Sequence, residues 1–133
     1  MSYFADREFF CKCGRAACDK QIGAAPELLR VLNVVRDAVG RPVIIRSGNR
    51  CDYWNRQNRG ADDGEHERQG GCQGADLEAL RSRDRFELVT AALRAGVTRL
   101  GIGRDFVHVG VGATPADAPE VIWTYYPQPG GHA

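Results

Sequence analysis

The clearest hydrophobic pattern lies in residues 26–39, where apolar side chains recur at intervals of three and four residues. Pro26 stands at the first position and Gly40 follows the last, which are the places that these residues favour at helix ends. The pattern predicts an amphipathic helix buried along one face, whose apolar positions are Leu28, Val31, Leu32, Val35 and Val39.

A second helix is predicted to begin near Ser82 or Asp84 and to stop at Gly96. Its spacing assigns to the buried face Phe86, Val89 and Leu93. A polar and aromatic stretch around Trp54 is predicted to form a short third helix.

Short runs rich in β-branched and aromatic residues predict the strands. They cover residues 42–47, 75–79, 100–103, 106–111 and 121–126, the third and fourth of which could form one bent strand. With the predicted helices, this order indicates an α+β domain with a small, mostly antiparallel sheet. Residues 1–20 have no lasting period and are expected to form an irregular arm whose aromatic side chains pack on the core. Residues 127–133 are expected to be a flexible tail.

The length of 133 residues fits a single domain over residues 1–133, which we expect to be monomeric. A net charge of +1, with cations spread among acids, argues against a nucleic-acid partner. No apolar run reaches the roughly 20 residues of a membrane helix, and the first residues lack the pattern of an export signal. If the protein works outside the cytoplasm, we expect delivery by another route, such as a phage particle or a holin-like release.

Candidate chemistry lies in the glycine-rich loop of residues 60–76, which contains His66 and ends at Asp76, and in the later strand that contains His108. Alternation along that strand places the histidine on the face opposite its flanking valines. Each residue alone has a simpler explanation, such as a capping aspartate or a hydrogen-bonded histidine. Together they have the composition of a three-ligand metal site with an open position, which a hydrolytic zinc centre requires.

The five cysteines leave three interpretations open. Cys11, Cys13 and Cys18 could hold a second, structural zinc ion, although their spacing has no obvious fourth ligand. The cysteines could instead be free thiols. In the third interpretation the protein binds no metal, and a disulfide between Cys51 and Cys72 holds the glycine-rich loop.

Several segments in the same order resemble the M15 peptidases, specifically the zinc D-alanyl-D-alanine carboxypeptidase group and its phage-borne relatives. The resemblance extends from about Phe9 to Tyr125. It is carried by residues 42–51, Asn55, Gly60, Ala61, His66, Asp76 and residues 106–109, and also by residues 10–14 and 123–125.

The resemblance implies a Hedgehog/DD-peptidase fold with zinc held by His66, Asp76 and His108. It implies that Arg50 binds the terminal carboxylate of a peptidoglycan stem peptide, a role that suits a planar bidentate donor. Asp105 stands where several members place the general base, provided that the chain bends before His108. The implied activity is hydrolysis of peptide bonds in peptidoglycan, as a D,D-carboxypeptidase or an endopeptidase, by metal-activated water.

The sequence also departs from this family in four places. The interval from His66 to Asp76 is longer than usual, and the common residues serine, tyrosine and aspartate are replaced by Gly64, Asn49 and Gly110. The last belongs to the group's common His-x-Asp motif, for which the neighbouring acids Glu65 and Glu67 could substitute. These departures support an alternative function, in which the protein is a catalytically weak or inactive cell-wall-binding or virion component.

Overall fold

A five-stranded sheet forms the centre of the protein, in a computed structural model that describes residues 2–60, 64–112 and 114–125. The strand order is β1-β2-β4-β3-β5, and only the β3–β5 pair is parallel. The strands are β1 (Ile45–Ser47), β2 (Gly74–Glu78), β3 (Arg99–Ile102), β4 (Phe106–Gly110) and β5 (Val121–Thr124). The predicted α+β class with a small, mostly antiparallel sheet is therefore confirmed.

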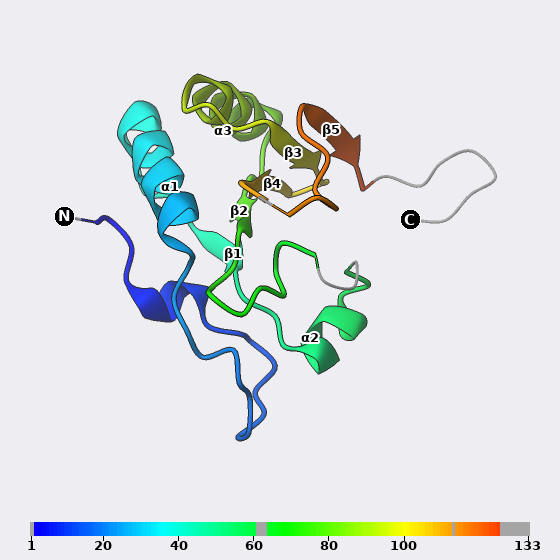
Figure 1. Ribbon diagram of the computed structural model, residues 1–133. Helices are drawn as coiled ribbons and strands as arrows, with labels where there is room; N and C mark the ends of the chain where they lie inside the picture. Colours follow the sequence, from blue (N-terminus) through cyan, green and yellow to red (C-terminus); the bar gives the residue numbers. More distant parts are fainter. Residues whose placement is uncertain (1, 61–63, 113, 126–133) are drawn as a thin grey trace.

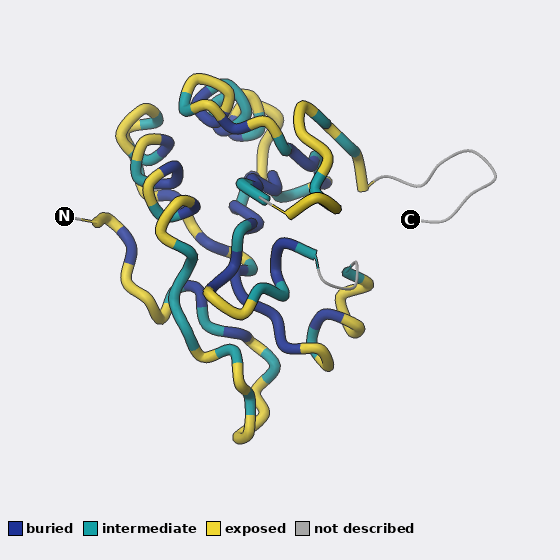
Figure 2. Tube along the Cα trace, in the orientation of Figure 1, coloured by how far each residue is buried: buried dark blue, intermediate teal, exposed yellow. Residues whose placement is uncertain are grey.

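Two long helices, α1 (Pro26–Val39) and α3 (Ser82–Arg94), pack against each other on one side of the sheet (Figure 1). Most of the buried core residues belong to these two helices and to the central strands (Figure 2). α1 has the predicted bounds, and Gly40 ends it with a positive φ of 69°. None of the helices in the described ranges is long and apolar enough to cross a bilayer.

The predicted buried face of α3 is wrong at Phe86 and Leu93, whereas Val89 is partly buried against the core as predicted. Phe86 is 67% exposed and Leu93 is 50% exposed, whereas the buried side of the helix is formed by Asp84, Leu88, Ala91 and Ala92. Both sets recur at helical spacing, so periodicity alone cannot choose between them. The alanines are the better contact surface because their small side chains let α3 approach α1 closely.

The central strands place the core and the polar residues on opposite faces of the sheet. β2 and β4 are antiparallel, with Asp76 directly opposite His108. Their neighbours Ala75, Leu77, Val107 and Val109 are fully buried in the core. Because side chains alternate along a strand, Asp76 and His108 share the other face, as the valines around the histidine predicted.

The N-terminal arm packs on the end of β1, which is shorter than the predicted 42–47. The arm contains one 3-10 helix, η1 (Asp6–Phe9), and its Phe4 and Phe9 are buried in the core as expected. A Cβ on Gly48 would lie 2.8 Å from the Cα of Phe9, so glycine is needed for this close approach. Asn49 Nδ2 donates to the carbonyl oxygens of Phe9 in the arm and of Ile22 and Gly23 just after it. The predicted tail at 127–133 lies outside the described residues.

None of the five cysteines is joined in a disulfide, so the predicted alternative of a Cys51–Cys72 disulfide is wrong. Cys51 begins the short helix α2 (Asp52–Gln57), the helix predicted around Trp54, and its Sγ lies 3.7 Å from Cys11 Sγ. Cys72 is buried separately in the main core.

Candidate metal centre

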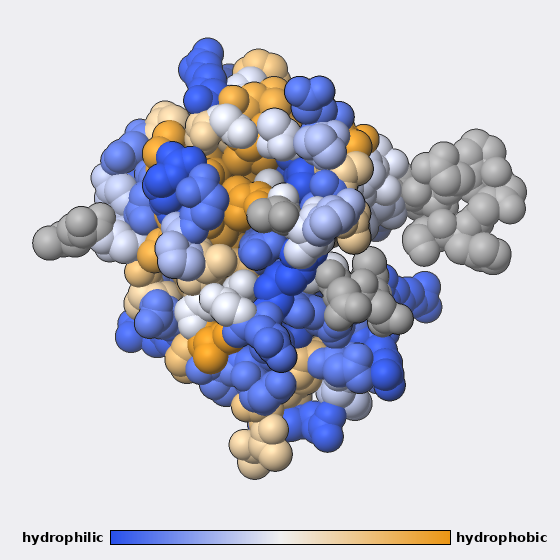
Figure 3. Space-filling model, viewed as in Figure 1, coloured by the Kyte–Doolittle hydropathy of each residue, from blue (hydrophilic) through white to orange (hydrophobic). Residues whose placement is uncertain are grey.

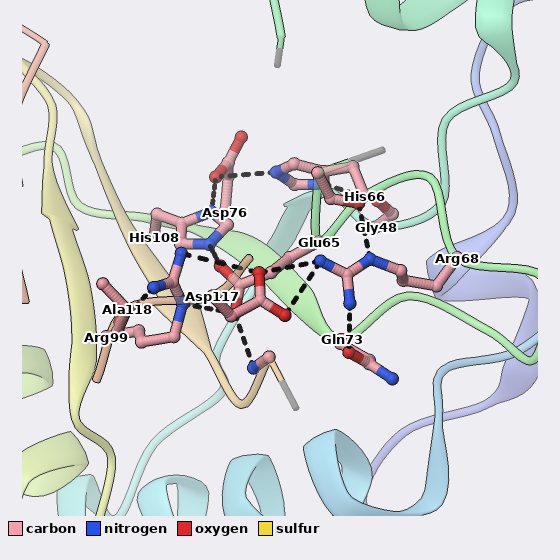
Figure 4. A network of polar contacts seen from close by, with 12 residues as sticks. Gly48, Glu65, His66, Arg68, Gln73, Asp76, Arg99, His108, Asp117 and Ala118 are labelled. Carbon is pink, nitrogen blue, oxygen red and sulfur yellow. Dashed lines mark hydrogen bonds and ion pairs between the residues drawn. The ribbon is translucent and has the colours of Figure 1, made fainter. Parts of the chain in front are cut away.

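Three side chains from separate segments converge above the sheet (Figure 4). Asp76 and His108 come from β2 and β4, and His66 comes from the loop that precedes β2. Asp76 Oδ1 lies 3.0 Å from His108 Nδ1 and 3.4 Å from His66 Nε2. One ligand atom from each residue lies within 4.8 Å of the other two, so the set can hold a metal ion. The three ligands predicted from the sequence are thus brought together.

Each of the three side chains is held by a further partner on the side away from the shared point. The carbonyl of Gly48 accepts from His66 Nδ1 at 2.6 Å, which leaves the lone pair on Nε2. His108 Nε2 lies 2.9 Å from Glu65 Oε1, which leaves Nδ1 facing Asp76. Arg50 Nη2 donates to Asp76 Oδ2 at 3.0 Å. Partners of this kind orient metal ligands and fix the histidine tautomer.

Burial and neighbouring charges shift the pKa values of the three side chains. Burial disfavours the charged form of His108, but hydrogen bonds to Asp76 and Glu65 outweigh burial and raise the pKa of His108 to about 9. Burial lowers the pKa of His66. Burial alone would raise the pKa of Asp76, yet both histidines together hold it well below its usual range. The carboxylate is therefore ionised and available as a ligand.

Glu65 lies where a side chain on residue 110 would be. A Cβ on Gly110 would lie 2.1 Å from Glu65 Oε2. That carboxylate also accepts from Arg99 Nε at 3.0 Å and from the Gly112 amide at 2.7 Å. Its burial raises the pKa of Glu65, but contact with His108 and these donors lowers it overall. Glu65 therefore supports His108 as an ionised acceptor and is poorly suited to be a general base.

The ligands open onto a cavity of about 780 Å³. Arg50 lies in its wall and donates to Ser47, Asn55 and Asp76 through three of its five N–H groups. Asp105 also lines this cavity, 47% exposed and 3.6 Å from Arg46. The chain bends at Arg104 and Asp105, just before β4, which is the bend that the role predicted for Asp105 requires.

Sequence reasoning missed the polar framework under the loop. Arg68 donates to both oxygens of Asp117, at 2.8 and 3.0 Å, and to Gln73 Oε1 at 2.7 Å (Figure 4). The Arg50 amide donates to the His66 carbonyl, which ties the loop to the end of β1. Arg68 stands among several arginines and its partner is 49 residues away, so the local sequence gave no signal for this contact.

A family model described as Peptidase M15 matches residues 2–110, which is most of the chain. The chain belongs to the peptidase M15 family. The match includes all three ligands together with Arg50 and Asp105, and it also includes the arm with its cysteines. The M15 peptidase thus combines a peptidase family assignment with a group of side chains that suits a metal. No curated protein matches the chain.

Proposed function

We propose that this M15 peptidase is a zinc enzyme that hydrolyses peptide bonds in peptidoglycan stem peptides, as a D,D-carboxypeptidase or an endopeptidase. The observation that carries the proposal is the convergence of two imidazole nitrogens and one carboxylate oxygen, each held by its own partner, at the wall of a cavity. Two nitrogen ligands with one oxygen ligand suit zinc, and catalytic zinc sites use three protein ligands.

When bound, zinc would act as a Lewis acid that activates water and polarises the carbonyl of the scissile amide. Asp105 is the candidate acceptor for the proton of that water, because its carboxylate is exposed in the same cavity. Substrate entry would have to bring the reacting atoms within its reach. Asp105 is a better candidate than Glu65, whose oxygens already accept from three groups.

The cavity has features that suit a peptide with a free carboxylate. Arg50 keeps two N–H groups beyond those that hold the site, enough for a bidentate contact. Further cations in the wall are Arg46, Arg59 and Arg99. The wall also contains aromatic rings: the Trp123 ring lies 5.3 Å from the His108 ring, and the Phe106 ring lies 4.9 Å from the Tyr125 ring. These rings provide an apolar wall against which a substrate side chain could pack.

The test combines zinc content with release of D-alanine or new amino groups from purified peptidoglycan. His108→Ala should bind about one zinc ion fewer per chain than wild type and should lose activity. His132→Ala is the matched control and should change neither quantity. Loss of one zinc ion in His108→Ala, with a wild type that releases nothing, would instead favour the inactive cell-wall-binding or virion component. Equal zinc content in both proteins would overturn the ligand assignment.

A further inference from the structure

A second cluster of metal-ligating side chains lies where the N-terminal arm meets α2. It consists of four thiols, three on the arm and one at the start of the helix: Cys11, Cys13, Cys18 and Cys51. Their sulfur atoms all lie within 4.8 Å of one another. Cys51 is the fourth ligand that the spacing of the first three did not reveal. The cluster shares no residue with the histidine site.

The distances between these sulfur atoms suit a metal better than a disulfide. Cys11 Sγ and Cys51 Sγ are 3.7 Å apart, whereas bonded sulfurs are separated by about 2.05 Å. Zinc–sulfur bonds of about 2.3 Å place the corners of a tetrahedron about 3.8 Å apart. The observed separation therefore matches one edge of a tetrahedral thiolate site.

Backbone amides point at each sulfur atom of the cluster. The donors to Cys13 and Cys18 are Arg15 and Lys20, each two residues further along, both at 3.4 Å. Cys11 Sγ accepts from the amide of Cys51, and Cys51 Sγ accepts from that of Trp54, also at 3.4 Å. Such N–H groups stabilise thiolate charge and orient thiolate ligands.

Residues 12–21, which include Cys13 and Cys18, bury little apolar surface of their own. Every residue from 12 to 21 is exposed or half-buried, and strongly hydrophilic side chains gather over α2, beside the weakly apolar tip of the arm (Figure 3). The Cys11 amide donates to the Lys20 carbonyl, which folds the arm back so that Cys18 returns beside Cys11. A segment that buries so little apolar surface needs another source of order, and a metal ion can supply it.

We infer that Cys11, Cys13, Cys18 and Cys51 form a structural site for zinc, separate from the histidine site. Binding exchanges four thiol protons for the metal and involves no oxidation. The ion would join the arm to α2. Because Cys51 directly follows Arg50, the site would also fix the chain beside the guanidinium that holds Asp76.

Cobalt gives a readout that activity does not influence, because thiolate ligands produce an intense sulfur-to-cobalt absorption and a histidine–aspartate site does not. Wild type and His108→Ala loaded with cobalt should both show this absorption. Cys13→Ser and Cys18→Ser should lose it and bind about one zinc ion fewer than wild type. Cys72→Ala removes the one cysteine outside the cluster and should retain the absorption. Its absence from wild type would overturn the inference.

Thiol protection in unmutated protein covers the case in which a cysteine variant fails to fold. About four of the thiols should resist a thiol reagent in zinc-loaded protein and should become reactive after a chelator is added. Reactivity that the chelator does not change would overturn the inference, as would a Cys11–Cys51 disulfide detected in protein purified with zinc. Failure of the histidine site would appear separately, as His108→Ala with unchanged zinc content.

Discussion

Substituting Glu65 tests whether this loop residue replaces the aspartate of the His-x-Asp motif, whose position on β4 is occupied by Gly110. Glu65 accepts from His108 Nε2 at 2.9 Å and from Arg99 and the Gly112 amide with its other oxygen. Losing such a partner of a metal-ligating histidine typically costs 10- to 100-fold in metal affinity. Glu65→Ala should therefore weaken zinc binding at the histidine site by about 1.4 to 2.7 kcal/mol.

Gly110 allows the opposite substitution, in which an aspartate is added on β4 with and without Glu65 in place. Gly110→Asp in the wild-type background should destabilise the protein, because its Cβ would lie 2.1 Å from Glu65 Oε2 and would add a second carboxylate to a buried site. In Glu65→Ala the same space is vacant. An aspartate there can approach Arg99, the Gly112 amide and His108. Gly110→Asp should then restore most of the lost zinc affinity.

A double-mutant cycle gives the coupling between the two positions. The assay is competition with a chelator, for the two single variants, the double variant and wild type, with unfolding by denaturant to measure stability. The double variant should bind zinc at least tenfold more tightly than Glu65→Ala, a coupling of about 1.4 kcal/mol or more. Glu87→Gln, on α3 and paired with Arg41, is the control and should match wild type. Additive effects of the two substitutions would refute the assignment of Glu65 as the replacement.

Three further predictions concern other parts of the site. Asp105→Asn should lower kcat by about 10²- to 10⁴-fold with zinc content unchanged, measured by amino-group release and metal analysis. Burial raises the pKa of Asp117, but hydrogen bonds from Arg68 and Thr114 outweigh burial and lower this pKa to about 2. The ionised Asp117 should therefore contribute its full stabilisation of the folded state above about pH 4 and lose it as the pH falls toward 2. The difference in unfolding free energy between wild type and Asp117→Asn should shrink by about 2 kcal/mol between pH 4 and pH 2. A difference that stays constant would contradict the stabilising role of ionised Asp117. Gly48→Ala should cost about 1 to 3 kcal/mol because its Cβ meets the backbone of Phe9, whereas Gly70→Ala, which meets nothing within 4 Å, should cost less than 1 kcal/mol.

Local pattern was sufficient for most of the elements and for the face of the sheet on which His108 lies. α1 follows from its spacing and its end residues, and the side of His108 follows from alternation with the flanking valines, whereas its pairing with Asp76 is set by the sheet register. The ligand types and their order also agreed with the M15 family, which added information that periodicity does not contain. Helices, strands and the types of the candidate ligands could therefore be predicted from local pattern and from the family resemblance.

Contacts between distant segments could not be predicted in this way. Glu65 and Arg99 are 34 residues apart, and each is one of many charged residues in the chain. The two apolar stripes of α3 differ only in how they fit α1, which is a property of packing. Cys51 was grouped with Cys72 because both flank the loop, whereas the fold of the arm brings Cys51 to Cys11.

The segment from Gly48 to Cys51 explains why the arm and the metal centre depend on each other. The Gly48 carbonyl orients His66, and the Asn49 side-chain amide donates to the carbonyls of Phe9, Ile22 and Gly23, in the arm and just after it. Arg50 then holds Asp76, and Cys51 joins the thiol cluster. His66 and Asp76 are thus oriented by Gly48 and Arg50, which are the chain neighbours of Asn49, the residue that contacts the arm. Asn49 replaces the tyrosine usual in this family, and its side-chain donors give that position a role in anchoring the arm. A displaced arm would therefore shift the partners of His66 and Asp76 without touching either ligand.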